Sequence, residues 1–380
     1  MYFLFINIRK REMKFLIPTE PDDSHALLVK MALENMGHYV QCLFTADQPT
    51  LLKNSAYVDQ TGYRWKSADD YESVLHENYE VVWWRRARKP YIPQHKTHPG
   101  DYKFALRENT LFYESLTDNM APNSWWVNPK GAANKVNSKL YQLNMANECG
   151  MDIPITLCSN DPKEIRNFLS KYEEYGVIYK PLCSNFWFEE EQVKISYTSS
   201  INFKDLPDNH ILQLVPGIFQ IEIEKIFELR VTCFGDYIVA AKLHSQIHPD
   251  GKIDWRAIPE GEMIIEPYRL PPDLEDKIRV FMHKTGIVFG SFDFIVTPCG
   301  RHIFLEVNEQ GQFLWIEEYN PDFKMLDMFV RFLLSRTRRF HWNPQKTEHT
   351  IARYQYEMNR AICVNMERHI DLNCAKIHSE

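Results

Sequence analysis

Several features that would assign this sequence to a class at once are missing from it. Its 380 residues contain no run of about 18 apolar residues, so we expect no membrane-spanning helix. The eight cysteines form no C-x-x-C pair, which favours reduced thiols over a disulfide framework or a zinc site. The net charge is -7 and no long basic block is present, so nucleic acid is not an expected partner.

The N-terminus lacks the pattern of a targeting signal. In MYFLFINIRKREM the charged residues follow the apolar ones instead of preceding them, and no small-residue cleavage site comes next. A second methionine, Met13, directly precedes the apolar run KFLIP, so we interpret residues 1–12 as an extension. We expect a cytoplasmic protein without a membrane partner.

The first part of the chain alternates between strand and helix patterns. KFLIP (14–18) predicts a buried strand, SHALLVKMALENMG (24–37) a helix that ends at Gly37, and HYVQCLF (38–44) a second strand. This β-α-β order indicates a parallel, Rossmann-like sheet. We expect an N-terminal domain over residues 1–125.

The length of the chain predicts further domains or subdomains. We expect a central subdomain over 126–215, a C-terminal domain over 216–336 that ends in an apolar helix, and a polar tail over 337–380 whose role the sequence does not indicate. The overall class is therefore α/β (α+β).

Two strand patterns in the C-terminal part predict a hairpin. SFDFIV and HIFLEVN flank the turn segment TPCGR. If the turn is centred directly after Cys299, Pro298 faces Arg301 and, further out, Asp293 faces Glu306. A bulge would shift this pairing by one residue.

The polar residues of this hairpin share one face. Ser291 with Asn308 is the next pair on the face of Asp293 and Glu306, because residues two apart in a strand point the same way. Like charges this close repel unless a cation lies between them, and Asp, Glu and Asn oxygens suit Mg²⁺. The alternative is a polar outer face of a two-layer sheet.

Candidate phosphate-binding groups are dispersed, because the chain has neither a G-x-x-x-x-G-K-[ST] loop nor a G-x-G-x-x-G motif. Lys139 begins a predicted helix and Lys180 ends the apolar strand VIYKPL, where it can reach a phosphate as a point charge. Glu228 and Arg230 lie two apart in FELRV and share a strand face. The alternatives are a solvated helix face for Lys139 and a surface ion pair for Glu228 with Arg230.

Taken together, these segments resemble the ATP-grasp superfamily, and they are similar to the ligases that cross-link ribosomal peptides, the microviridin or graspetide maturases. The resemblance spans residues 14–336. It rests on these segments: WWRRARKP, WWVNPKGAANKVNSKLYQLNMANECGMDIPITLCSNDP, VIYKPL, FQIEIEKIFELRV, SFDFIV and FLEVNEQGQFLWIE. It implies an ATP-grasp fold with an N-terminal Rossmann-like pre-ATP-grasp domain, a small central lid subdomain and a C-terminal antiparallel sheet.

The resemblance also implies roles for residues. Its nucleotide-binding positions are Lys139, Lys180, Gln220, Ile221, Glu222, Ile223, Glu228 and Asn308, of which 220–223 form the hinge strand. Arg230 matches the catalytic arginine that faces the phosphates and the acyl phosphate. Asp293, Glu306 and Asn308 match the Mg²⁺ ligands.

Two departures from the family pattern leave positions open. Ile221 stands where an acid often follows the glutamine, so the register of the hinge is not fixed. The loop KPLCSNFWFEEE lacks the glycines that usually cover the phosphates, and Ser184 and Asn185 are candidate contacts there.

The resemblance implies an ATP- and Mg²⁺-dependent ligase. It would activate Asp or Glu side chains of a ribosomal precursor peptide, with leader and acidic core, as acyl phosphates and close macrolactone or macrolactam rings. We expect a homodimer. Arg85, Arg86 and Arg88 are candidates to attract the acidic peptide, the alternative being a solvated basic loop. The rival functions are a free-standing ligase of amino acids or small peptides and a non-catalytic ATP-binding protein.

Overall fold

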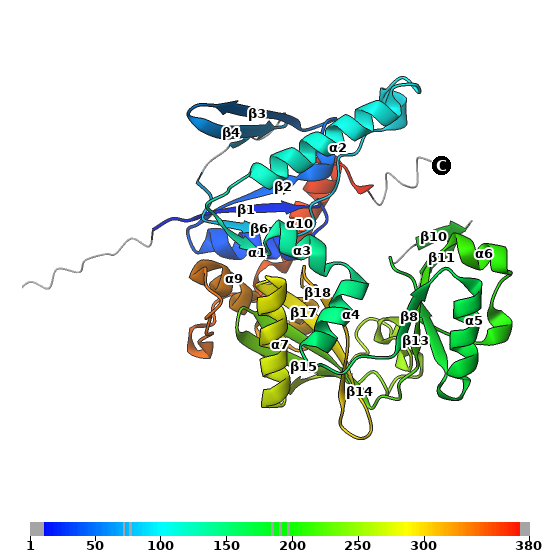
Figure 1. The fold of residues 1–380 in the computed structure, drawn as a ribbon. Helices are drawn as coiled ribbons and strands as arrows, with labels where there is room; N and C mark the ends of the chain where they lie inside the picture. The colour runs from blue at the N-terminus through cyan, green and yellow to red at the C-terminus, as the bar shows by residue number, and fades with distance from the viewer. Residues whose placement is uncertain are drawn as a thin grey trace, which may run out of the picture. The chain divides into compact units, whose positions relative to one another are not determined.

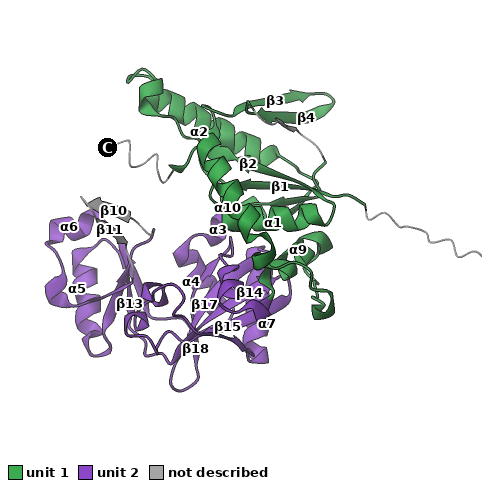
Figure 2. Ribbon diagram, turned by 180° about the vertical axis from the view of Figure 1, so that it is seen from behind, with its two compact units in different colours: residues 1–130, 324–380 green, residues 131–323 purple. Residues whose placement is uncertain are grey.

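The computed structural model describes residues 11–70, 73–75, 78–183, 186–189, 192–195 and 198–372. The chain divides into two compact units, coloured separately in Figure 2: Met1–Lys130 with Lys324–Glu380, and Gly131–Phe323. The C-terminal end of the chain therefore belongs to the same unit as the N-terminal end. Residues 1–10 of the predicted extension, and Ser184 and Asn185, lie outside the described residues.

The first unit is built on a four-stranded parallel sheet, as the β-α-β pattern predicts. The strands lie in the order β2-β1-β6-β7, and all of them pair in parallel. Their bounds are β1 Lys14–Thr19, β2 Tyr39–Phe44, β6 Val81–Trp83 and β7 Trp125–Val127. Strands of a parallel sheet are buried on both faces, which accounts for the continuous apolar runs in their sequences.

Helix α1 (Ser24–Asn35) connects β1 to β2. Its N-terminus is capped by Asp23, whose side chain accepts hydrogen bonds from the N–H groups of His25 and Ala26 at 3.2 and 3.4 Å. Gly37 follows the helix with a φ of 86°, a backbone conformation that glycine adopts at low cost. The predicted helix and its glycine stop are thus confirmed.

Three further helices and a small antiparallel sheet complete the first unit (Figure 1). The helices are α2 Tyr102–Asn119, α9 Met325–Ser335 and α10 Ile351–Arg368. The sheet has the order β3-β4-β5, with bounds Lys53–Asp59, Gly62–Ala68 and Ser73–Leu75.

Asp327 ties the polar segment after α9 to that helix. This fully buried carboxylate accepts hydrogen bonds from the Trp342 indole N–H at 2.8 Å, the Glu348 backbone N–H at 3.1 Å and the Arg331 Nε at 3.2 Å. Further along, Arg353 on α10 donates to the Asn35 side chain at the end of α1 at 3.0 Å. The tail whose role was open is therefore a structural part of the first unit.

The larger sheet of the second unit has five antiparallel strands in the order β16-β15-β14-β17-β18. Their bounds are β14 Phe227–Phe234, β15 Tyr237–Leu243, β16 Ile265–Tyr268, β17 Phe289–Val296 and β18 His302–Asn308. Buried phenylalanines on one face pack beneath α7 (Pro272–Thr285), with Phe281 and Phe292 ring centroids 5.4 Å apart. The opposite face of β17 and β18 carries the polar residues of the site.

The smaller part of the second unit has a four-stranded antiparallel sheet in the order β12-β9-β13-β8. Its strands are β8 Thr156–Ser159, β9 Val177–Lys180, β12 Ser199–Ile201 and β13 Gly217–Ile221, with helices α5 Pro162–Lys171 and α6 Asn209–Leu214 and the hairpin β10 Phe186–Glu189 and β11 Gln192–Ile195. The expected central subdomain ended at residue 215, whereas β13 lies beyond that residue and hydrogen-bonds into this sheet.

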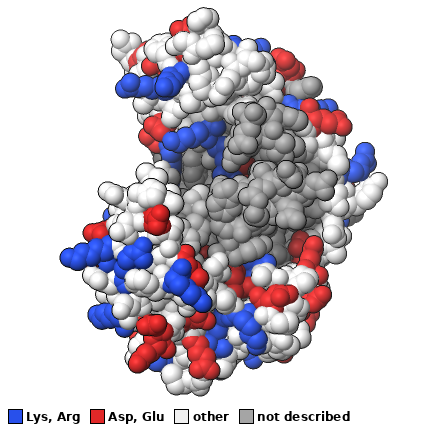
Figure 3. Space-filling view, turned by 90° about the vertical axis from the view of Figure 1, so that its right-hand side faces the viewer, with Lys and Arg blue, Asp and Glu red and all other residues white. Residues whose placement is uncertain are grey.

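The remaining helices of the second unit are α3 Lys130–Val136, α4 Lys139–Glu148 and α8 Trp315–Tyr319. No helix in the described part of the chain has both the length and the apolar character needed to cross a bilayer. On the face shown in Figure 3, basic and acidic side chains of the described residues are interspersed instead of forming a continuous basic surface.

Candidate functional site

Asp293 and Glu306 face each other across two antiparallel strands, as the sequence predicts. β17 and β18 pair with Asp293 opposite Glu306 and with Ser291 opposite Asn308. Directly opposed residues of such a pair have Cβ atoms about 4.5–5.5 Å apart. The two carboxylates and the amide of Asn308 therefore share one patch of the sheet face.

The turn between these strands differs from the prediction by one residue. Thr297 N–H donates to the Arg301 carbonyl at 3.0 Å, so the turn is centred on Cys299 and Pro298 does not face Arg301. An irregularity in β18 at Leu305 inserts one residue and restores the expected register further from the turn. The prediction of the carboxylate pair is correct because these two shifts cancel.

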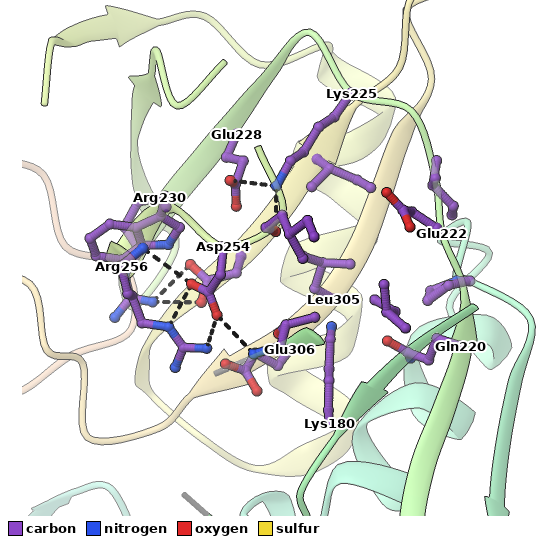
Figure 4. Close-up of a pocket in the computed structure, with 18 of the residues that line it drawn as sticks. Lys180, Gln220, Glu222, Lys225, Glu228, Arg230, Asp254, Arg256, Leu305 and Glu306 are labelled. Atoms are coloured by element: carbon purple, nitrogen blue, oxygen red, sulfur yellow. Dashed lines mark hydrogen bonds and ion pairs between the residues drawn. The ribbon is translucent and has the colours of Figure 1, made fainter. Parts of the chain in front are cut away.

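A cavity of about 420 Å³ surrounds the carboxylate pair (Figure 4). The residues that the resemblance matches to nucleotide, metal or catalytic positions all line it: Lys139, Lys180, Gln220, Ile221, Glu222, Ile223, Glu228, Arg230, Asp293, Glu306 and Asn308. The irregularity in β18 lets Leu305 and Glu306, although adjacent in sequence, both line the cavity. The predicted residues from four separate stretches of chain thus meet in one place.

Each carboxylate of the central pair is held by a cation. Arg230 Nη1 donates to both oxygens of Asp293 at 2.8 Å, and its Nη2 donates to the carbonyls of Gly311 and Gln312 at 2.6 and 2.9 Å. Lys139 Nζ forms an ion pair with Glu306. Both cations come from elements other than the hairpin, so the site is assembled by tertiary structure.

The two carboxylates have different electrostatic environments. Burial raises the pKa of Asp293, and the neighbouring Glu306 adds to this effect against the opposing influence of Arg230. Burial also acts to raise the pKa of Glu306, but Lys139 and Lys180 outweigh it, so the pKa is lowered. The charged form is therefore disfavoured at Asp293 and favoured at Glu306.

The donor set fits a hard divalent cation. Asp293, Glu306 and Asn308 present oxygen ligands on one face, and Mg²⁺ prefers a few carboxylate oxygens supplemented by water or phosphate. The Asn308 Oδ1 is oriented by hydrogen bonds from the N–H groups of Gln310 and Gly311 at 3.0 and 3.1 Å. No group of three or more His, Cys, Asp or Glu side chains suited to a metal occurs among the described residues, which leaves two carboxylates and an amide as the candidate set.

Lys180 adds a second lysine to the cavity. It is the last residue of β9, is half-buried and lines the cavity. Burial lowers its pKa, while Glu306 acts in the opposite direction. An ammonium that is short of compensating negative charge is suited to bind a phosphate.

Glu228 does not form the surface ion pair with Arg230 that was the alternative interpretation. Lys225 Nζ donates to Glu228 at 2.8 Å and to the Ile253 carbonyl at 2.9 Å, and both charged side chains are 8% exposed. Burial raises the pKa of Glu228 against the opposing effect of Lys225. Both Glu228 and Arg230 are thus buried groups of the cavity wall.

Near β13 the cavity is lined by Ile178, Ile221 and Ile223, and two polar groups there have no hydrogen-bond partner among the described residues. The Ile221 and Glu222 N–H groups donate to the carbonyls of Ile155 and Gly176 at 3.1 and 2.9 Å. Gln220 Nε2 donates to Thr156 at 2.9 Å, but its buried Oε1 has no hydrogen-bond partner among the described residues. The next backbone N–H, that of residue 223, is also without a partner in the described part of the chain.

Sequence reasoning missed several residues of the wall opposite β13. Arg256 donates to both oxygens of Asp254 at 2.8 and 2.5 Å, and Trp255 between them lines the cavity together with Trp315. These residues lie in a long loop between β15 and β16 and after β18, where no periodic pattern marks them. The acid-x-Arg spacing in KIDWRAIPE was the available signal.

The predicted substrate arginines belong to the first unit and are not equivalent. Arg85 is 0% exposed and donates to Asp23 at 3.0 Å, so no peptide can reach its guanidinium. Arg88 donates to both oxygens of Glu20 at 2.5 and 2.9 Å, while Arg86 lies 3.6 Å from the same carboxylate. Arg85 is thus a structural residue, and only Arg86 and Arg88 reach the surface.

No protein-family model and no curated protein matches this chain. Solved structures, in contrast, match it over most of its length. The macrocyclase MdnC bound with precursor peptide MdnA, from Microcystis aeruginosa, is 28% identical, with a TM-score of 0.74 over 85% of this chain and 100% of that one. The macrocyclase MdnB from the same organism is 26% identical, with a TM-score of 0.71 over 85% and 99%.

A third structure has a similar fold. The Chryseobacterium gregarium RiPP-associated ATP-grasp ligase, in complex with ADP and a leader and core peptide, is 24% identical. Its TM-score is 0.76 over 87% of this chain and 100% of that one. The similarity in all three cases covers both units of the chain.

Proposed function

We propose that this chain, an ATP-grasp ligase similar to the enzymes that mature ribosomal peptides, closes rings in a precursor peptide. Asp or Glu side chains of the peptide are activated by ATP and then joined to a hydroxyl or an amine. The products are macrolactones or macrolactams. The partner is a ribosomal peptide with a leader and an acidic core.

One observation carries this proposal. A single cavity combines an apolar end with unused hydrogen-bonding groups, several cations and a pair of carboxylates in register. A nucleoside triphosphate needs these three elements in this order, because its base is flat and apolar-faced and its phosphates are anionic. The similarity to two macrocyclases, at 28% and 26% identity, supports a peptide as the second substrate.

At the apolar end, the chain offers adenine one donor and one acceptor. The backbone N–H of Ile223 can donate to a ring nitrogen, and the Gln220 Oε1 can accept from the exocyclic amino group. The Ile221 N–H already donates to the Ile155 carbonyl, so the backbone contact to adenine is assigned to Ile223. Ile223 is therefore the hinge contact that we propose for the register that the sequence left open.

At the other end, Lys139, Lys180 and Arg230 can bind the phosphates. Asp293, Glu306 and Asn308 would hold Mg²⁺, which when bound neutralises phosphate charge as a Lewis acid. The protein contributes positioning and electrostatic stabilisation, since phosphoryl transfer needs no protein nucleophile.

The reaction proceeds in two steps. A carboxylate oxygen of the peptide attacks the γ-phosphorus, the bond from phosphorus to the bridging oxygen breaks, and its electron pair leaves with ADP. A peptide hydroxyl or amine then attacks the acyl carbon. The carbon–oxygen bond to phosphate breaks, and the proton of the nucleophile leaves with the inorganic phosphate.

The experiment measures ADP release by the purified chain with ATP and Mg²⁺. The probe is a synthetic copy of the short acidic, Thr- or Lys-rich peptide that this proposal expects to be encoded beside the gene. We expect ADP release and loss of water from the peptide, neither of which occurs with free amino acids. Release with amino acids alone, or the lack of such a reading frame, would instead support the free-standing ligase.

A non-catalytic ATP-binding role is disfavoured by the complete set of Arg230, Asp293, Glu306 and Asn308 in the cavity. A chain that binds ATP without any turnover in the presence of the peptide would restore that role. We further expect a cytoplasmic homodimer, which light scattering of the purified chain can check.

A further inference from the structure

Two tryptophans form a stacked pair in the wall of the cavity. The rings of Trp255 and Trp315 have centroids 4.8 Å apart and an interplanar angle of 22°. Both residues line the cavity and are only half-buried. Two large aromatic faces at the edge of a polar, charged site are not needed to hold phosphates or metal.

The pair is fixed in place next to the arginine of the site. Trp315 Nε1 donates to the Gln312 carbonyl at 2.8 Å, and Arg230 Nη2 donates to the same carbonyl at 2.9 Å. Tyr319 packs edge-on against Trp315 at 6.1 Å, and its hydroxyl accepts a hydrogen bond from Gly261 N–H at 3.1 Å. The loop that carries Trp255 is therefore anchored to α8.

The pair lies at the end of the cavity away from the base. Figure 4 shows Arg230 and Arg256 on the side of the cavity opposite Gln220. Trp255 directly precedes Arg256, and Trp315 shares a hydrogen-bond acceptor with Arg230. The tryptophans are thus beside the phosphate end, where the second step of the reaction would occur.

We propose that Trp255 and Trp315 form the apolar wall of the acceptor subsite, which packs the aliphatic part of the attacking Thr, Ser or Lys side chain and excludes water. This inference rests on the proposed function. Aromatic side chains supply large contact surfaces at low cost in conformational entropy. An apolar surface at this position excludes water, so the peptide hydroxyl or amine reaches the acyl phosphate in its place.

The two possible fates of the acyl phosphate make the proposal testable. Attack by the peptide hydroxyl or amine at the acyl carbon gives a ring and inorganic phosphate. Attack by water gives the original carboxylate and inorganic phosphate, so ATP is consumed without a product. The ratio of rings formed to ADP released therefore reports on the acceptor subsite, whereas ADP release alone reports on activation.

The experiment measures this ratio for Trp255→Ala with the same synthetic peptide, by mass spectrometry for rings and a coupled assay for ADP. We expect rings per ADP to fall on the order of tenfold, because a displaced acceptor attacks slowly. ADP release should persist. Trp255→Phe retains an aromatic face and should stay within about twofold of the parent ratio.

Ile247→Ala is the matched control, since Ile247 lies in the same loop, is 69% exposed and is not part of the cavity wall. The proposed acceptor subsite would be wrong if Trp255→Ala kept the parent ratio of rings to ADP. It would also be wrong if ring formation and ADP release fell by the same factor. Failure of the parent chain to release ADP with the peptide would instead count against the proposed function.

Discussion

Two buried Asp–Arg pairs, one in each unit, have opposite electrostatics. Arg85 donates to Asp23 at 3.0 Å, and although burial acts to raise the pKa of Asp23, the arginine outweighs it and the pKa is lowered. Arg230 donates to both oxygens of Asp293 at 2.8 Å, yet burial raises the pKa of that carboxyl. Asp23 has further partners that lower its pKa, among them His25 and Arg86, whereas Asp293 faces Glu306, a second carboxylate that adds to the effect of burial.

The comparison separates a structural ion pair from a functional one. Asp23 also accepts from the Thr19 hydroxyl at 2.7 Å and caps α1, so its hydrogen-bonding capacity is used within the protein. Asp293 instead lines a cavity, where its carboxylate faces that of Glu306. A sequence pattern of arginine and acid cannot distinguish the two cases, whereas the presence of a cavity can.

The largest effect that we expect is on stability, when the structural pair is broken. Asp23→Asn leaves Arg85 buried without its counter-charge, so the free energy of unfolding should fall by about 3–5 kcal/mol. Asp293→Asn also removes the carboxylate partner of a buried arginine, but Arg230 keeps its hydrogen bonds to the Gly311 and Gln312 carbonyls, so we expect a smaller fall, of about 1–2 kcal/mol. Urea denaturation of both variants measures the contrast, and equal destabilisation would remove the distinction.

The next effect is on catalysis. Glu306→Gln keeps the size of the side chain but removes a candidate metal ligand, so we expect peptide-dependent ADP release to fall by about 10²–10³-fold. The thermal midpoint should stay close to that of the parent chain. Glu318→Gln, a change of the same type at an exposed position outside the cavity, is the control. Undiminished turnover in Glu306→Gln would contradict the metal assignment.

A pH dependence should belong to the structural pair. Because the folded pKa of Asp23 is lowered from 3.8, its contribution to stability is present above that value and is lost as the pH falls through the folded pKa. Denaturation of the parent chain from about pH 5 to about pH 3 should show this loss. Asp23→Asn should show a shallower decline, and an identical slope would argue against the assigned pKa shift.

The smallest effect that we expect is on metal affinity, when Lys139 is replaced. Lys139 pairs with Glu306, so it should compete with a metal ion when no nucleotide is bound. Lys139→Met should increase the affinity for Mn²⁺ alone by about fivefold, as measured by electron paramagnetic resonance of the free ion. Lys135→Met is the control, because Lys135 packs over the Tyr141 ring at 4.7 Å and is not part of the cavity wall. Equal Mn²⁺ affinities would show that the ion pair does not compete.

The parts of the fold that the sequence predicts are those with local signals. The strands around α1 follow from apolar runs, and its ends follow from Asp23 and Gly37. The pairing of Asp293 with Glu306 follows from alternation in two short strands. Its turn was misplaced, because the bulge at Leu305 leaves no mark in an apolar run.

The other parts depend on contacts between distant segments. The apolar period of α9 predicts a helix but not that it packs in the first unit, since the period does not specify the partner. Trp255 and Arg256 enter the site from a long loop without periodicity. The burial of Arg85 depends on Asp23, 62 residues away in the chain.

The most direct test of the proposed function is to intercept the activated peptide. The chain, ATP, Mg²⁺ and the synthetic acidic peptide are incubated with hydroxylamine, which converts an acyl phosphate to a hydroxamate. We predict an ATP-dependent hydroxamate on an Asp or Glu side chain of the peptide, located by tandem mass spectrometry and absent with Glu306→Gln. ADP release without any peptide hydroxamate, or a hydroxamate on free amino acids only, would contradict the account.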